Sequence, residues 1–175
     1  MVAQGTREPA DIVISRVAPA QWQEYRQVRL AALAEAPFAF GSTLDRELGL
    51  DEQVWRRRLG SRGTFLAWAG GEPAGTATAV PDDPDDEFAV PGAWQLVGMW
   101  VDPRSRGGGV ADLLVDAVAD HARAAGATQL VLWVTEVNAR ARAFYQRMGF
   151  RATGARQLVR PDEPNHWEEQ LIRGL

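Results

Sequence analysis

A run of three glycines at positions 107–109 is the part of the sequence whose composition most directly suggests chemistry. It stands between a predicted buried strand at residues 94–101 and a predicted amphipathic helix that ends near Gly126. Glycine lets the backbone approach a ligand closely, and the first amides of a helix lack intrahelical partners and lie at the positive end of its dipole. Arg104 and Arg106 add positive charge beside these amides. The pattern therefore predicts a cradle for a pyrophosphate group.

Two common phosphate-binding motifs fit this run poorly. A Walker A loop requires Gly-Lys-Ser/Thr, whereas Gly109 is followed by Val110 and Ala111. A dinucleotide-binding G-x-G-x-x-G fingerprint would place Asp112 at its third glycine. Glu136 could imitate the ribose-binding acid of that fingerprint, but it lies farther from the glycines than the usual distance of roughly twenty residues. A nucleotide-dependent oxidoreductase is therefore the weakest hypothesis.

A third motif fits better, because a second one follows it along the chain. The segment 106–111, RGGGVA, resembles the R/Q-x-x-G-x-G/A signature of the GCN5-related N-acetyltransferase (GNAT) family, and it follows Val-Asp-Pro as it does in that family. The segment 138–150, NARARAFYQRMGF, is similar to the family's second motif, N-x-x-A-x-x-F-Y-x-x-x-G-F. The departures are mild: a third glycine at Gly108, and Ala111 where glycine is common. The close match covers residues 94–150, the expected acetyl-CoA-binding core.

The resemblance implies an N-acetyltransferase that passes the acetyl group of acetyl-CoA to a primary amine of a small molecule or a protein or peptide, by direct attack in a ternary complex. In that family the pantetheine arm pairs with the central strand, and amides of the glycine loop hold the pyrophosphate. Asn138 is also a natural helix N-cap, and a solvated helix surface is an equal alternative for Arg142. The residues implied to bind acetyl-CoA are Met99, Trp100, Val101, Arg104, Arg106, Gly107, Gly108, Gly109, Val110, Ala111, Asn138 and Arg142.

Attack by an amine on a thioester requires a base, a donor for the developing oxyanion and an acid for the departing thiolate. The family's acid tyrosine matches Tyr145, whose phenol has an ordinary pKa of about 10, close to that of an alkyl thiol; packing in the core is the alternative role. Gly98 is compatible with a bulge that frees a backbone amide, or simply with close packing. A chain of water molecules could replace the base. Side chains that could act as the base are Glu136, at the end of a predicted strand, and Asp45, Glu47 and His166.

The elements that must position these residues follow from periodicity and turn signals. Strands and helices alternate only in the second half of the chain, so the sheet should be mixed. We expect an α/β (α+β) fold with a mixed, mostly antiparallel central sheet of six to seven strands flanked by about four helices, the acyl-CoA N-acyltransferase architecture of the family. Strands are predicted at 11–17, 64–69, 73–80, 94–101, 129–134, 151–159 and 167–172, and helices at 19–36, 51–60, 110–126 and 138–148.

Some assignments stay open at this stage. The segment 37–50 is either a loop that walls a substrate pocket or a core plug formed by Phe38 and Phe40. Together with residues 29–33 it is similar to the region that usually forms the acceptor wall in bacterial members of the family, so specificity should lie there. The helix after the glycines is expected to bury Val110, Leu113, Leu114, Ala117, Val118 and His121.

Composition and net charge exclude several classes of protein. With 175 residues, 46% of them hydrophobic and 24% charged, the chain is the size of one globular domain, and we expect residues 1–175 to form a single acyltransferase domain with a loose terminus at 1–10. A net charge of −4 argues against a general partner such as nucleic acid or an anionic membrane. The sequence has no cysteine and two histidines, so no metal site is expected. No leader or long apolar run is visible, which leads us to expect a cytoplasmic protein.

One function of another class competes with catalysis. The same fold could serve as a non-catalytic acyl-CoA-binding or regulatory module, although the presence of both Tyr145 and Asn138 speaks against it. The sequence leaves open the acceptor amine, the general base and the use of acyl groups other than acetyl. It also leaves open whether the chain forms a homodimer, as many members of the resembling family do.

Overall fold

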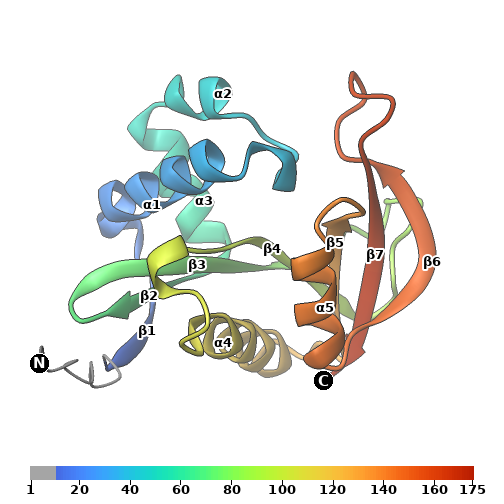
Figure 1. Cartoon of the computed structure of the whole chain (residues 1–175). Helices are drawn as coiled ribbons and strands as arrows, with labels where there is room; N and C mark the ends of the chain where they lie inside the picture. The colour runs from blue at the N-terminus through green and yellow to red at the C-terminus, as the bar shows by residue number, and fades with distance from the viewer. Residues whose placement is uncertain (1–10) are drawn as a thin grey trace, which may run out of the picture.

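A seven-stranded sheet with helices on both faces forms the described part of the chain, residues 11–175 of a computed structural model (Figure 1). The loose terminus predicted at residues 1–10 lies outside this range. The strands are β1 (Ile12–Arg16), β2 (Gly63–Ala69), β3 (Glu72–Pro81), β4 (Ala93–Val101), β5 (Gln129–Thr135), β6 (Arg151–Leu158) and β7 (Trp167–Gly174). The α-helices are α1 (Trp22–Glu35), α2 (Leu44–Leu48), α3 (Glu52–Ser61), α4 (Val110–Ala124) and α5 (Ala139–Arg147). Short 3-10 helices lie at Pro19–Gln21, Pro37–Ala39 and Pro103–Ser105.

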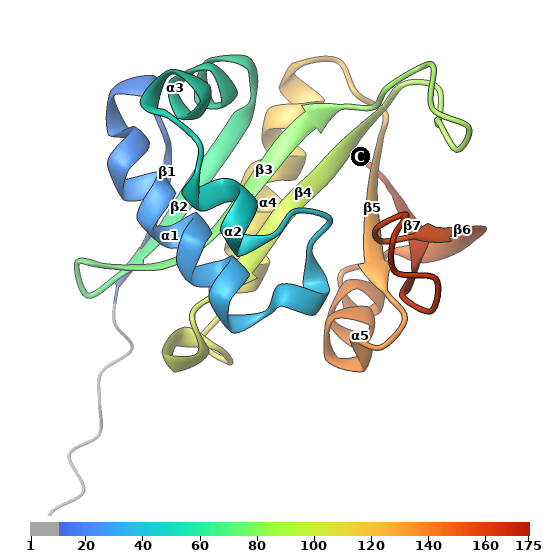
Figure 2. The same ribbon diagram turned by 90° about the horizontal axis from the view of Figure 1, so that it is seen from above.

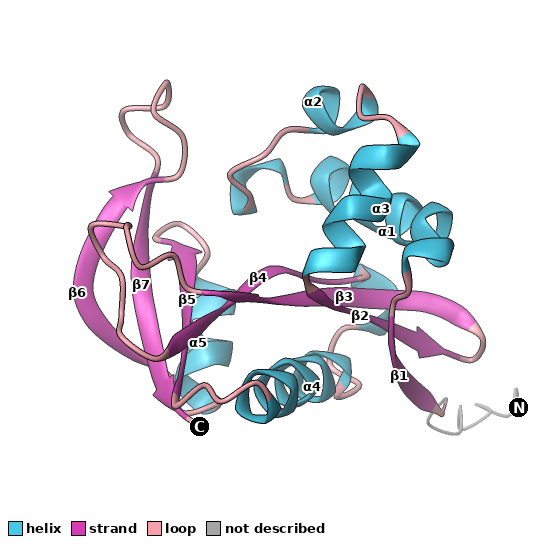
Figure 3. Ribbon diagram, turned by 180° about the vertical axis from the view of Figure 1, so that it is seen from behind, coloured by secondary structure: helices cyan, strands magenta, loops and turns pink. Residues whose placement is uncertain are grey.

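The strand order, β1-β2-β3-β4-β5-β7-β6, confirms the mixed, mostly antiparallel sheet. Within the described range, β4 and β5 form the one parallel pair. Helices α1, α2 and α3 lie over one face of the β1–β4 half, and α4 lies against the opposite face (Figures 1 and 3). Helix α5 lies beside β5 (Figure 2) and shares a hydrophobic core with α4. Residues 11–175 contain one α-helix more than the four expected. The additional helix is α2, which lies in the segment 37–50, where no helix was predicted.

Strands β4 and β5 separate after the first third of β4. In the described chain they are paired only over the first three residues of β4, ending at Gln95. The register with β3 jumps between Val97 and Trp100, so β4 holds one residue more than β3 over this stretch. Gly98 has a φ of 62°, a left-handed conformation that side chains other than glycine's disfavour. Of the two interpretations left open for Gly98, the structure shows the bulge, and neither Gly98 nor Met99 has a register partner on a neighbouring strand.

Helix α4 buries Val110, Leu114 and Val118 as predicted, but its buried face is rotated about the helix axis relative to the predicted face. The prediction was wrong for Leu113, which is 40% exposed, and for Ala117 and His121, which are half-buried. The helix lies flat across β2, β3 and β4, so the small side chains of Ala119 and Ala122 can face the strands. Its buried residues are Val110, Leu114, Val115, Val118, Ala119 and Ala122.

Two helices next to the site start at predicted caps. The Asp51 carboxylate accepts a hydrogen bond from the Val54 amide at 3.0 Å, which starts α3. The Asn138 side chain accepts one from the Ala141 amide at 3.1 Å, which starts α5. Among the helices of residues 11–175, none combines the length and the apolar character needed to cross a membrane.

Candidate active site

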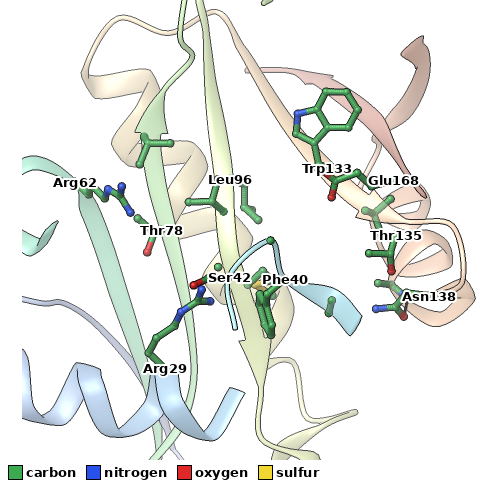
Figure 4. A pocket seen from close by; sticks show the side chains of 18 of the residues that line it. Arg29, Phe40, Ser42, Arg62, Thr78, Leu96, Trp133, Thr135, Asn138 and Glu168 are labelled. Carbon is green, nitrogen blue, oxygen red and sulfur yellow. Dashed lines mark hydrogen bonds between the residues drawn. The ribbon is translucent and has the colours of Figure 1, made fainter. Parts of the chain in front are cut away.

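Two cavities meet beside α5. The glycine-loop cavity has a volume of about 640 Å³ and extends from Arg106, Gly107 and Gly109 to α5. The splay cavity has a volume of about 430 Å³ and opens where β4 and β5 separate, under helices α1 to α3 (Figure 4). Both cavities are lined by Ala39, Phe40, Met99, Asn138, Ala141 and Tyr145. A molecule in either cavity therefore reaches the same small group of side chains.

The segment 37–50, whose two interpretations were left open, contributes both to the cavities and to the core. Phe40 is 7% exposed and packs in the core, whereas Phe38 is 43% exposed and is not a core plug. Ala39 and Phe40 line both cavities. From the loop between β6 and β7, the Arg160 guanidinium donates to the Phe40 carbonyl at 2.7 Å. This hydrogen bond therefore ties the segment 37–50 to the loop between β6 and β7.

The glycine loop presents backbone rather than side chains to its cavity. Gly107 and Gly109 have φ values of 82° and 88°, and a Cβ at either position would meet no atom within 4 Å. Helix α4 begins directly after Gly109, so its first amides lie beside this open space. The Arg106 guanidinium donates to Glu35 Oε2 at 2.7 Å and to the Val101 carbonyl at 3.0 Å. These residues fit the diphosphate of a coenzyme, because such a group needs free amides, close approach and nearby positive charge.

The structure brings most of the predicted cofactor residues together at this cavity. Arg104 lies apart, since its side chain is 83% exposed and paired with Asp102 at 2.9 Å. Arg142 is bound to Glu169 at 2.5 Å, and neither arginine lines a cavity. Gly108 and Val110 are likewise not among the lining residues. Those that do line the glycine-loop cavity are Met99, Trp100, Val101, Arg106, Gly107, Gly109, Ala111 and Asn138.

Tyr145 lies where the two cavities meet. Its side chain is 6% exposed and packs edge to face against Phe144 and Phe150, with ring centroids 5.1 and 5.7 Å away. Among residues 11–175, no group forms a hydrogen bond with its hydroxyl. Burial raises the pKa of Tyr145 above its ordinary value, so the phenol stays protonated over the neutral range. Tyr145 can therefore pack in the core and still keep the proton that a donor needs.

The bases considered from the sequence lie in different surroundings. Glu136 is paired with Arg156 at 2.6 Å, a hydrogen bond that lowers the pKa of Glu136, and it lines neither cavity. Asp45 and His166 also line neither cavity. Glu47 lines the splay cavity, but as the acidic member of a network of arginines.

Glu168 is a polar residue of the splay cavity that the sequence reasoning missed. It lies on β7 directly opposite Thr135 of β5, and Gln157 Nε2 donates to its carboxylate at 2.8 Å. Burial raises the pKa of Glu168 above its usual value. The available signal was the alternation of the predicted strand, which places Glu168 and the buried Gln170 on one face.

A cluster of arginines forms the wall of the splay cavity opposite Glu168 (Figure 4). Arg29 donates from Nε and Nη2 to the two carboxylate oxygens of Glu47, at 3.1 and 2.9 Å, and Arg58 lies 3.4 Å from the same carboxylate. Burial alone would raise the pKa of Glu47, but these guanidinium groups hold it below its usual value. Arg62 completes the cluster.

Comparison with known protein families and sequences agrees with this site. The family model described as Acetyltransferase (GNAT) family matches residues 23–150. A curated relative, the mycothiol acetyltransferase of Geodermatophilus obscurus, is 33% identical over 88 residues. That match covers 50% of this chain and 28% of the relative, so the chain corresponds to well under half of the relative's length.

Solved structures share the fold. An acetyltransferase of the GNAT family from Streptococcus pneumoniae superposes with a TM-score of 0.75 at 19% identity, covering 94% of this chain and 99% of that one. The yncA structure from Salmonella typhimurium, determined with its cofactor acetyl-CoA, gives 0.73 at 17% identity, covering 95% of each chain. The ribosomal-protein-alanine N-acetyltransferase from Brucella melitensis gives 0.72 at 19% identity, covering 93% and 99%.

Proposed function

Because the chain belongs to the Acetyltransferase (GNAT) family, we propose that it transfers the acetyl group of acetyl-CoA to a primary amine by direct attack in a ternary complex. The observation that carries this proposal is the meeting of the two cavities at Tyr145 and Asn138. The glycine-loop cavity takes the coenzyme and the splay cavity takes the amine. Since both cavities reach Tyr145, the two substrates can be held side by side at the same time.

Acetyl-CoA, when bound, supplies the acetyl group as a thioester. The amides that follow Gly107 and Gly109 hold its diphosphate, and Arg106 adds positive charge next to them. The backbone of β4 around Met99 has no register partner on β3 or β5, so its polar groups are free to pair with the amide-bearing arm of the coenzyme.

Three groups of the chain then act on the reacting atoms. Glu168, whose raised pKa suits a base near neutral pH, accepts the proton of the attacking amine. Backbone amides at the Gly98 bulge stabilise the negative charge that develops on the carbonyl oxygen, an effect on the order of 3 kcal/mol for one decisive donor. The Tyr145 hydroxyl donates its proton to the sulfur as the C–S bond breaks.

The test is a panel of primary amines offered with acetyl-CoA, in which released thiol and acetylated amine are both measured. We expect at least one amine to give equal amounts of the two products, with the rate depending on Tyr145. If coenzyme A stabilises the protein against heat while no amine in the panel is acetylated, the chain is a binding module rather than an enzyme.

A further inference from the structure

The helical wall of the splay cavity carries an excess of positive charge. Arg29, Arg58 and Arg62 line it, and Glu47 is the one acidic residue on this wall within the described chain. Glu47 is 1% exposed and its carboxylate is already shared between Arg29 and Arg58. Arg62 forms no hydrogen bond or ion pair with any residue of 11–175. Three arginines and one glutamate leave an excess of two positive charges facing the cavity.

These charges lie beside the point where the acetyl group must be transferred. Arg29 uses Nε and Nη2 to bind Glu47, and its remaining nitrogen, Nη1, would lie 3.8 Å from a Cβ placed on Gly98. Arg62 immediately precedes β2, where the register runs from Thr64 to Thr78 of β3 and on to Val97 of β4. Figure 4 shows the guanidinium groups of Arg29 and Arg62 on the side of the cavity away from Glu168. Arg29 thus borders the β4 bulge, and Arg62 lines the same cavity.

An unpartnered polar atom in the wall of the cavity points independently to a polar ligand. Thr135 is 2% exposed, and its hydroxyl is buried without a hydrogen-bond partner among residues 11–175. Because a buried polar group without a partner is costly, the Thr135 hydroxyl marks a place where a hydrogen-bonding group of a ligand would be stabilised.

We propose that the acceptor is a small amine that also carries a carboxylate, of the α-amino acid class. Its carboxylate lies against Arg29 and Arg62, and its amine lies between the Gly98 bulge and Glu168. This inference rests on the proposed function, and it names the substrate class of the same site. Guanidinium groups bind carboxylates with paired, charge-assisted hydrogen bonds. Because Nη1 of Arg29 lies close to the bulge, an anionic group that it binds would be only a few bonds from the reacting nitrogen, as in an α-amino acid.

The same charges assist the chemistry. A cation close to the amine disfavours its protonated form, so the arginine wall lowers the pKa of the amine and increases the fraction present as the nucleophile. A volume of about 430 Å³ is in the range of small-molecule sites.

The experiment compares each common amino acid as the free acid and as its carboxamide, which removes the negative charge and keeps the shape. The enzymes are the wild type, Arg62→Gln, and Arg57→Gln as a matched control, since Arg57 is an exposed neighbour on α3 that lines neither cavity. We expect the best free acid to exceed its carboxamide about tenfold or more in kcat/KM. Arg62→Gln should remove most of that preference through KM, and Arg57→Gln should keep it.

Calorimetric titration of the free acids into the protein loaded with coenzyme A gives a second readout that needs no turnover. Binding that weakens about tenfold in Arg62→Gln alone supports the carboxylate site. Equal or better acetylation of carboxamides overturns the inference and leaves acetyl transfer intact. The inference also fails if no free acid binds or reacts while other amines are acetylated. If no amine of any kind is acetylated and coenzyme A does not bind, both proposals fail.

Discussion

Thr135 of β5 and Glu168 of β7 stand directly opposite each other in the antiparallel register, and both side chains line the splay cavity. The Thr135 hydroxyl has no hydrogen-bond partner in the described chain, and the Glu168 carboxylate receives one hydrogen bond, from Gln157. Two neighbouring strands therefore offer oxygen atoms side by side at the point where the sheet opens. An amine entering the cavity can donate to both.

The first prediction concerns Glu168→Gln, which keeps the size of the side chain and its contact with Gln157. A base must be ionised, so activity falls as the pH drops through its pKa, and burial places that fall at a higher pH than for an ordinary glutamate. We expect kcat/KM to drop about 100-fold and the acid limb of the pH profile to disappear. Glu136→Gln, the same change at the other carboxylate considered as a base, should leave the limb in place. The reverse pattern would assign the base to Glu136.

Tyr145→Phe should lower kcat about 100-fold or more while the protein keeps its fold. The hydroxyl has no hydrogen-bond partner among the described residues, so its removal should change the free energy of unfolding by less than about 1 kcal/mol. Since burial raises the pKa of Tyr145, the wild type should keep its proton donor, and its kcat, through the mildly alkaline range. Unchanged turnover in the variant, measured by thiol release, would exclude Tyr145 as the acid.

Replacement of Arg106 tests the diphosphate cradle. Arg106→Glu places a carboxylate where the coenzyme brings its negative charge, and it should abolish the thermal stabilisation that coenzyme A gives the wild type. Arg106→Gln should weaken binding about tenfold. Arg123→Glu, a change of the same charge at the exposed far end of α4, is the control and should keep full stabilisation. Equal stabilisation of Arg106→Glu and the control would contradict the cradle.

Glu47→Gln should destabilise the protein by about 3 kcal/mol, because it leaves two largely buried arginines without their shared counter-charge. The pKa of Glu47 is lower in the folded chain than its ordinary value of 4.5, so its stabilisation is present above that value and is lost as the pH falls through the lowered one. Chemical unfolding followed from neutral to acid pH should therefore show a steeper loss for the wild type than for the variant. Parallel curves would show that Glu47 contributes no such linkage.

Much of the coenzyme side of the site could be predicted because its signals are local. Gly107 and Gly109 adopt positive φ, and Asn138 caps the helix that carries Tyr145, so each feature depends on residues that are close together in the sequence. The bulge at Gly98 is local in the same way.

The acceptor side depends on contacts between distant segments, and the sequence shows less of it. The surroundings that make Glu168 our proposed base come from Thr135 and Gln157, which lie on other strands. Leu113 fits the helical period of a buried face, yet the way α4 lies across three strands turns it outward. The sequence near Glu136 does not show that Arg156, twenty residues later, pairs with its carboxylate. For each of these residues, burial and hydrogen-bond partners are decided by contacts with distant segments and not by the neighbouring sequence.

Ala39 and Phe40 belong to the walls of both cavities, so the two substrates that we propose would share this part of the wall. If one of them displaces Ala39 and Phe40, the binding free energy of the other changes as well. Such cooperativity is reciprocal: the factor by which acetyl-CoA alters the affinity for the acceptor equals the factor by which the acceptor alters the affinity for acetyl-CoA. Each substrate would then bind more tightly or more weakly in the ternary complex than alone by this one factor, whichever of the two binds first.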